Sequence, residues 1–248
     1  MSAHPTDPSP IVELRQYTLH PGQRDVLIDL FDREFVETQE AHGMRVLGQF
    51  RDLDQPDHFV WLRGFDDMVA RHRALTGFYG GRVWAAHRDA ANATMVDSDN
   101  VLLLRLAWPG ATAALPQRAR PAAGAAAAQQ PAAGVVCATV FYLREPATPA
   151  LLDFCRHRMA PVLLRGGALQ QAWYCTEDSP NTFARLPVRE GAPVLLGLAL
   201  FHDAAAVRAF SDSGAWARQA AADLAPWLSP RAPDVLRLQP TGRSALHA

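Results

Sequence analysis

The chain has 248 residues, of which 49% are hydrophobic and 20% charged, and its formal net charge is −1. This composition is typical of a folded protein with room for two small cores, and it excludes disordered and fibrous classes. A charge near zero without a basic stretch leaves no electrostatic footprint for nucleic acid, so we expect no such partner.

Three further features bear on location and chemistry. The longest apolar run, 194–201, is far shorter than the roughly 20 residues of a membrane-spanning helix, so no membrane partner is expected. Residues 1–10 lack the apolar segment of a signal peptide, and we expect a cytoplasmic location. All 24 basic residues are Arg, which excludes a Schiff-base lysine and the lysine of a P-loop.

The sulfur and imidazole side chains predict no metal site. Cys137, Cys155 and Cys175 are widely spaced, which indicates buried thiols and not disulfides. The histidines between positions 20 and 87 show neither His-x-His nor His-Glu-x-x-His spacing.

The hydrophobic pattern predicts the secondary structure of the first half in chain order. After a disordered stretch at 1–9, we expect a strand at 10–19, a helix at 23–41 that ends at Gly43, and strands at 44–51 and 58–65. Helices at 67–75, capped by Asp66, and at 82–93 precede a strand at 100–106. This order is that of the ferredoxin-like unit.

The sequence then repeats this unit. Val12–Phe50 aligns with Val136–Tyr174 at an offset of 124 residues, and the match resumes after a longer loop, with Trp84 against Trp216. We therefore predict two domains, at 10–107 and 135–240, joined by an Ala/Pro-rich linker at 108–134 and followed by a tail at 241–248.

A four-stranded sheet with helices on one face leaves its other face bare, so two such sheets are expected to cover each other. The predicted fold class is therefore α+β, with two tandem ferredoxin-like domains whose antiparallel sheets pair into a barrel of the dimeric α/β type. The linker is long enough for the copies to pair within one chain or to exchange between two chains, and a homodimer of whole chains stays open.

The strands of the first copy hold a polar cluster that the second copy lacks. Alternation places Glu13, Arg15 and Tyr17 on one face of the first strand, where the second copy has Cys137, Thr139 and Phe141. Trp61 and Arg63 fall opposite Gly197 and Ala199, and Arg105 falls opposite Gln239. In the ferredoxin-like order the first strand lies between the third and fourth, so these side chains should meet.

One glutamate cannot balance three arginines, and a surplus of buried positive charge favours an anionic ligand such as a carboxylate or enolate. We expect Arg15, Arg63 and Arg105 to hold it, with Tyr17 and Trp61 as walls and Tyr79 at the mouth. Glu13 is the first candidate for proton transfer. The alternative is that Glu13 merely bridges the arginines across the strands.

A second candidate for proton transfer is His87, which shares one face of a predicted helix with Trp84 and Arg88. The second copy keeps the tryptophan at this place and loses the other two, so Trp84 also fits a core position. For His87 and Tyr79 the alternative interpretation is packing or surface exposure without a ligand.

The segments Glu13-Leu14-Arg15-Gln16-Tyr17-Thr18-Leu19 and Val60-Trp61-Leu62-Arg63-Gly64-Phe65-Asp66-Asp67, followed by Arg71, Phe78 and Trp84, resemble the NIPSNAP family of the dimeric α/β barrel superfamily. The resemblance covers residues 10–106, whereas the second copy matches in pattern alone. Bacterial members mostly lack an assigned reaction. Superfamily relatives include cofactor-free monooxygenases, isomerases and haem-binding enzymes, which place small hydrophobic substrates between sheet and helices.

The resemblance and the polar cluster together predict a bacterial-type protein that binds a small, partly apolar, anionic metabolite in its first domain. Conversion of that ligand would be monooxygenase-, isomerase- or lyase-like and would need no tightly bound cofactor. Two alternatives stay open: a non-enzymatic assembly or sensing protein, and a haem-dependent enzyme of the same superfamily.

Overall fold

The computed structural model of the chain describes residues 9–112, 120–191 and 193–248. The stretch predicted to be disordered at 1–9 therefore lies outside the described residues, except for Ser9. The strands in the described ranges are β1 (Ile11–Leu19), β2 (Arg45–Asp52), β3 (His58–Phe65), β4 (Met95–Leu106), β5 (Val135–Tyr142), β6 (Gln170–Thr176), β7 (Val194–Phe201) and β8 (Asp234–Pro240). They close into one antiparallel barrel in the order β1-β3-β2-β8-β5-β7-β6-β4.

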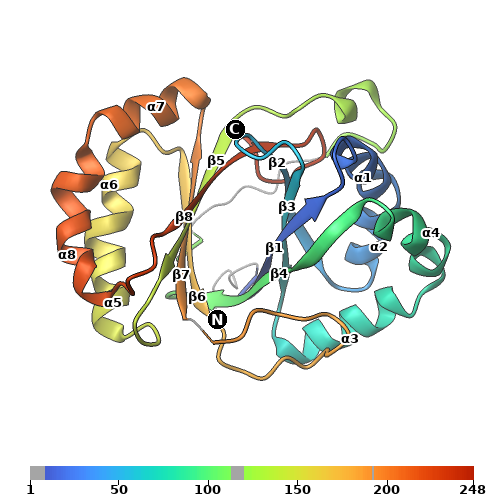
Figure 1. Ribbon diagram of the computed structural model, residues 1–248, viewed down its shortest axis with the longest axis horizontal. Coiled ribbons are helices and arrows are strands. Elements are labelled where there is room, and N and C mark those ends of the chain that lie inside the picture. The colour runs from blue at the N-terminus through green and yellow to red at the C-terminus, as the bar shows by residue number, and fades with distance from the viewer. Residues whose placement is uncertain (1–8, 113–119, 192) are drawn as a thin grey trace, which may run out of the picture.

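The helices cover the outside of this barrel in two groups, one for each half of the chain, with the sheets between them (Figure 1). The first group is α1 (Arg24–Leu30), the π-helical turn η1 (Phe31–Phe35), α2 (Val36–Ala41), α3 (Met68–Tyr79) and α4 (Arg82–Asn92). The second is α5 (Pro149–Phe154), η3 (Cys155–Met159), α6 (Ala160–Arg165), α7 (Ala204–Asp212), η4 (Ala217–Ala221), α8 (Ala222–Leu224) and η5 (Ala225–Trp227). A short 3-10 turn, η2 (Ala126–Gln129), lies between the halves. The predicted mixed α/β fold with an antiparallel sheet is confirmed.

Two details of the first half correct the sequence prediction. The side chain that caps α3 is that of Asp67, which accepts a hydrogen bond from the backbone N–H of Ala70, and not that of Asp66, which pairs with Arg45. Strand β4 begins at Met95 and not at residue 100, because its early part pairs with the end of β1 as far as Leu19.

The repeat seen in the sequence reappears in backbone detail. The π-helical turns Phe31–Phe35 and Cys155–Met159 lie at the same offset of 124 residues as the aligned sequences. Such turns are rare in helices, so their recurrence at matched positions indicates that the two halves share more than a hydrophobic pattern.

The barrel interior is filled by apolar side chains from both sheets, including Leu14, Phe50, Val140, Tyr174 and Leu196. The sheets join at two short seams, where Phe50–Asp52 pairs with Leu238–Pro240 and Leu104–Leu106 pairs with Tyr174–Thr176. Alternation then directs the opposite face of every strand toward the helices. A polar cluster on that face lies between sheet and helices and not between the two sheets.

The loops that follow β2 and β6 differ in length and in what they cover. Residues 53–57 form a tight hairpin that ends beside β8, where the N–H of Leu53 donates to the carbonyl of Arg237. The corresponding loop after β6, whose described residues are 177–191 and 193, runs across β4 and reaches α3 (Figure 1). The second half therefore covers part of the first.

The predicted tail at 241–248 packs against the first half. The hydroxyl of Ser244 accepts a hydrogen bond from the backbone N–H of Gln49, and Arg243, which is 2% exposed, pairs with Glu37. In the described parts of the chain, none of the helices combines the length and the apolar character that a membrane span requires.

Candidate functional site

The centre of the candidate site is the carboxylate of Glu13, on the helix-facing side of β1. Its Oε2 atom lies 2.7 Å from Nη1 of Arg15 and 2.7 Å from Nη2 of Arg63, and its Oε1 atom accepts a hydrogen bond of 2.7 Å from Nε of Arg71. All four side chains are buried, with exposed fractions of 0–1%. The sequence placed Glu13, Arg15 and Arg63 together, and the register of β1 with β3 accounts for it, because Glu13 lies opposite Arg63.

Electrostatics fix the protonation states of this cluster. Burial by itself would raise the pKa of Glu13, but the charges of Arg63, Arg15 and Arg71 outweigh it and hold the pKa far below its usual range. Burial likewise acts against the charged form of Arg15, yet Tyr17 and Glu13 outweigh it and raise the pKa of that guanidinium. Glu13 is therefore ionised at neutral pH and has both oxygens engaged, so it is poorly placed to accept a proton from a ligand.

Three guanidiniums against one carboxylate leave positive charge without a buried partner. The aromatic neighbours compensate in part, since the Arg15 guanidinium carbon lies 5.5 Å from the ring centroid of Tyr17 and 5.6 Å from that of Trp61. The Nη2 atom of Arg71 is buried and makes no hydrogen bond within the described parts of the chain. Burial accordingly lowers the pKa of Arg71.

A small cavity of about 130 Å³ adjoins this cluster at Arg15. Its walls include Tyr17, Tyr79 and Trp84 from the first half and Phe183 and Arg185 from the loop after β6. The loop is held in place by Asn181, whose Oδ1 accepts a hydrogen bond of 3.0 Å from Arg71 Nη1, and by packing of the Phe183 ring on Tyr79, with centroids 5.9 Å apart. The cavity is thus built by both halves, and each half contributes one arginine, Arg15 or Arg185, to its lining.

The structure does not bring every sequence candidate to this cavity. His87 is 33% exposed, lies 3.5 Å from Glu34, and is not among the residues that line the cavity. Arg88 is exposed beside Asp89. Trp61 is 2% exposed and packs beneath Phe31, with ring centroids 4.7 Å apart.

Arg105 corrects the expected composition of the cluster. It lies on the expected face of β4 but at the end of the strand, 37% exposed and 3.9 Å from Asp178. The third guanidinium on Glu13 is that of Arg71 instead. The repeat contained the signal for it, because at the offset that aligns Phe65 with Phe201, Arg71 falls opposite Val207.

Neither the cavity beside Arg15 nor the apolar cavity of the second half fits haem in the described parts of the chain. An axial ligand would have to be a side chain such as His, Cys, Met or Tyr. The cavity beside Arg15 has about the volume that holds one benzene molecule and is too small for a porphyrin. A larger cavity in the second half, described below, has Cys137 as its one such side chain, and burial raises the pKa of that thiol to about 11, which opposes thiolate ligation.

Comparison of the sequence with protein-family models matches residues 12–109 to the model described as NIPSNAP. The search of curated proteins gave no match.

Solved structures share the fold over nearly the whole chain. A protein from Lactobacillus acidophilus, provisionally named a monooxygenase, superposes with a TM-score of 0.58 at 10% identity and covers 95% of this chain and 97% of its own. An anthrone oxidase-like protein gives a TM-score of 0.55 at 13% identity over 98% and 97% of the two chains. A protein provisionally named a chlorite dismutase gives 0.51 at 12% identity over 95% and 97%. At these identities the likeness shows the fold alone.

Proposed function

Because the first half of the chain is a NIPSNAP domain, with the polar cluster on its sheet, we propose that this domain binds a small carboxylate with a short apolar body in the cavity beside Arg15. The observation that carries the proposal is the charge imbalance: one carboxylate faces three buried guanidiniums, and one of the three lines a cavity. An anion in that cavity would neutralise charge that the protein itself leaves uncompensated.

Each wall of the cavity has a separate role in this proposal. Arg15 donates to the carboxylate from the closed end, and the exposed Arg185 approaches from the loop side. Tyr79, Trp84 and Phe183 surround the apolar body. A volume of about 130 Å³ limits the enclosed apolar body to roughly one benzene-sized ring, since a cavity of about 150 Å³ accommodates benzene.

Glu13 has a positioning role in this scheme. Its two oxygens fix the orientations of Arg15, Arg63 and Arg71, and its charge reduces the cost of burying all three. The geometry supports binding better than conversion, because Glu13 has no free oxygen and His87 lies outside the cavity. Binding without conversion agrees with the sensing alternative. A cluster that faces the helices gives no support to a role in aligning the two sheets.

We also propose that the halves are tandem ferredoxin-like copies paired as in the dimeric α/β barrels. The strand order within each half, β4-β1-β3-β2 and β8-β5-β7-β6, supports this proposal, as do the matched π-helical turns.

Calorimetric titration of the full chain with benzoate, and with uncharged benzyl alcohol as the matched probe, tests the binding function. We expect benzoate to bind at least tenfold more tightly than the alcohol, because a charge-assisted hydrogen bond contributes about 1.5–3 kcal/mol. Arg15→Met should reduce the affinity for benzoate about tenfold or more, and Arg185→Met several-fold. Arg82→Met, on an exposed position of α4, is the control and should change nothing.

Two results would overturn the proposal. One is that benzoate binds no better than benzyl alcohol. The other is that Arg15→Met and Arg185→Met both retain the affinity of the unaltered chain. The Arg185 variant keeps the test decisive if Arg15→Met does not fold, since Arg185 lies on an exposed loop.

A further inference from the structure

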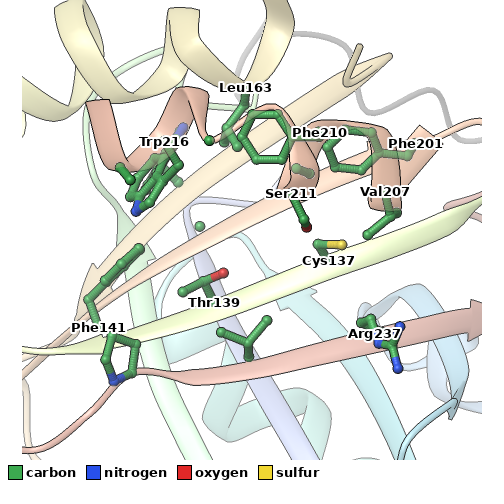
Figure 2. Close-up of a pocket in the computed structure, with 17 residues that line it drawn as sticks. Cys137, Thr139, Phe141, Leu163, Phe201, Val207, Phe210, Ser211, Trp216 and Arg237 are labelled. Carbon is green, nitrogen blue, oxygen red and sulfur yellow. The ribbon is translucent and has the colours of Figure 1, made fainter. Parts of the chain in front are cut away.

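An apolar cavity of about 420 Å³ lies in the second half, between the outer face of its sheet and its helices (Figure 2). Cys137 and Thr139 of β5 form its floor together with Gly197 and Ala199 of β7. Aromatic side chains form much of the wall, among them Phe210 of α7 and Trp216 at the start of η4. A volume of this size lies within the range of small-molecule sites.

The cavity occupies the place that the ionic cluster fills in the first half. Cys137, Thr139, Ala199 and Val207 align with Glu13, Arg15, Arg63 and Arg71. Four small side chains therefore replace one carboxylate and three guanidiniums, which removes both charge and volume. The same layer between sheet and helices is charged and nearly full in one half, and apolar and hollow in the other.

The floor of the cavity is shaped by close packing of Trp173 against Gly197, and not only by the loss of large side chains. A Cβ atom added at Gly197 would lie 2.7 Å from the ring of Trp173, so this tryptophan lies directly against the glycine backbone. The indole Nε1 of Trp173 donates a hydrogen bond of 2.8 Å to Gln171, which holds the ring in that position. Gly197 of β7 aligns with Trp61 of β3. The large aromatic side chain therefore lies on β3 in the first half and, as Trp173, on the neighbouring strand β6 in the second half.

The mouth of the cavity lies over β8, because the loop that could cover it is short. In the first half, the loop after β6 covers β4, where the N–H of Arg189 donates to the carbonyl of Val101 and Val101 is fully buried. The matching residue of the second half, Val235, lines the cavity and is 60% exposed. The hairpin 53–57 stops at Arg237, with which Asp54 forms an ion pair.

The polar groups of the cavity specify an uncharged ligand. Arg237 is the one charged side chain among the described residues that line the cavity, and it is already paired, with its Nε donating to Asp54 at 2.9 Å. An ion placed deeper would have no partner and would lose its hydration. Two hydroxyls, of Thr139 and Ser211, line the cavity without a hydrogen-bond partner among the described residues, so they are available to a ligand hydroxyl or carbonyl.

We propose that this cavity is a second binding site, for a neutral molecule of two or three aromatic rings that carries a hydroxyl, amine or carbonyl group. The site goes beyond the acid site of the first half and does not depend on it. The two sites have opposite charge preferences, so their ligands can be distinguished by charge alone.

A pair of fluorescent probes with one skeleton tests the proposal in the full chain. N-Phenyl-1-naphthylamine is neutral, and 8-anilinonaphthalene-1-sulfonate is the same skeleton with a sulfonate. We expect saturable binding of the neutral probe at one site, with at least tenfold lower affinity for the sulfonate. Thr139→Phe fills the floor and Ser211→Trp fills the mouth, and each should weaken binding of the neutral probe tenfold or more. Val69→Phe adds an aromatic ring at an exposed position of α3 and should leave it unchanged.

The proposal is overturned if the neutral probe does not saturate, if the sulfonate binds equally well, or if Thr139→Phe and Ser211→Trp both bind like the unaltered chain. Ser211 is exposed, so its variant decides the outcome if Thr139→Phe does not fold. Failure here leaves the benzoate result intact, since that assay reports a carboxylate at Arg15. If the benzoate assay fails, the neutral probe still tests the cavity of the second half.

Discussion

The ring of Phe183, a residue of the second half, packs on the ring of Tyr79 in the first half, and the two centroids lie 5.9 Å apart. Phe183 is 7% exposed and belongs to the core of the first half. This contact makes a loop of one half into a wall of the other half's cavity.

We predict that Phe183→Ala opens the cavity beside Arg15. Truncating a buried phenylalanine costs roughly 3 kcal/mol in the free energy of unfolding, and here the lost side chain also uncovers the ligand. Urea unfolding should show the loss of stability, and stopped-flow measurement should show faster release of benzoate. Phe210→Ala, which alters the cavity of the second half, is the matched control and should leave benzoate release unchanged.

We predict that Glu13→Gln destabilises the chain by about 3–5 kcal/mol, because it leaves three buried guanidiniums without their counter-ion. Urea unfolding at neutral pH measures this, with Glu145→Gln at an exposed position as the control. A change below about 1 kcal/mol would mean that the cluster is less tightly coupled than its distances indicate.

The same residue predicts a pH dependence. The pKa of Glu13 is lower in the folded chain than its ordinary value of 4.5, so the folded state binds this proton less readily than the unfolded state. Its contribution to stability is therefore complete above about pH 4.5 and is lost as the pH falls below that value. Stability measured between pH 7 and pH 3 should fall less steeply in Glu13→Gln than in the unaltered chain.

Asp32 predicts a dependence of the opposite sign. Burial is the main cause that raises its pKa from 3.8 to about 6, against a hydrogen bond from Gln49 and the charge of Arg243. The folded chain then holds this proton more tightly than the unfolded chain, and stability falls as the pH rises from about 4 to about 6. Asp32→Asn should remove this loss, which is about 3 kcal/mol in total for a shift of about two pH units, with about half of it falling between pH 5 and pH 8. Unfolding at pH 5 and pH 8 checks it, with the exposed Asp29→Asn as the control.

We predict that Gly197→Ala destabilises the chain by about 1–3 kcal/mol, because the new methyl group overlaps the Trp173 ring. The double variant Gly197→Ala/Trp173→Leu should recover part of the loss, so the two changes should be non-additive in a double-mutant cycle of unfolding free energies. Strict additivity would show that the overlap is relieved elsewhere.

Part of this architecture follows from the sequence. Strict alternation along 10–19 assigned Glu13, Arg15 and Tyr17 to one face, and the strand order that follows from the repeat placed Arg63 beside them. These are local patterns, and hydrophobic periodicity specifies them directly. The role of Arg71 could also have been predicted, because Val207 replaces it in the repeat. A single arginine on a helix is a weak indication, however, when the sheet that it faces is not known.

Two features could not be predicted from the sequence. The loop after β6 shows no apolar periodicity, and its contacts with the first half join residues about 110 positions apart, such as Arg71 and Asn181. The cavity of the second half depends on whether the helices settle onto the smaller side chains at 137, 139 and 199 or remain apart. That balance of packing and collapse is a property of the folded chain.

The loop after β6 has an evolutionary consequence. A first half on its own would lack Asn181, Phe183 and Arg185, so the niche beside Arg15 would stand open on one side. In a relative with a single domain, the corresponding wall would have to come from a neighbouring subunit. In this chain both halves belong to one polypeptide, so the loop after β6 always covers the cavity beside Arg15. The second half, which supplies that loop, has a separate cavity of its own.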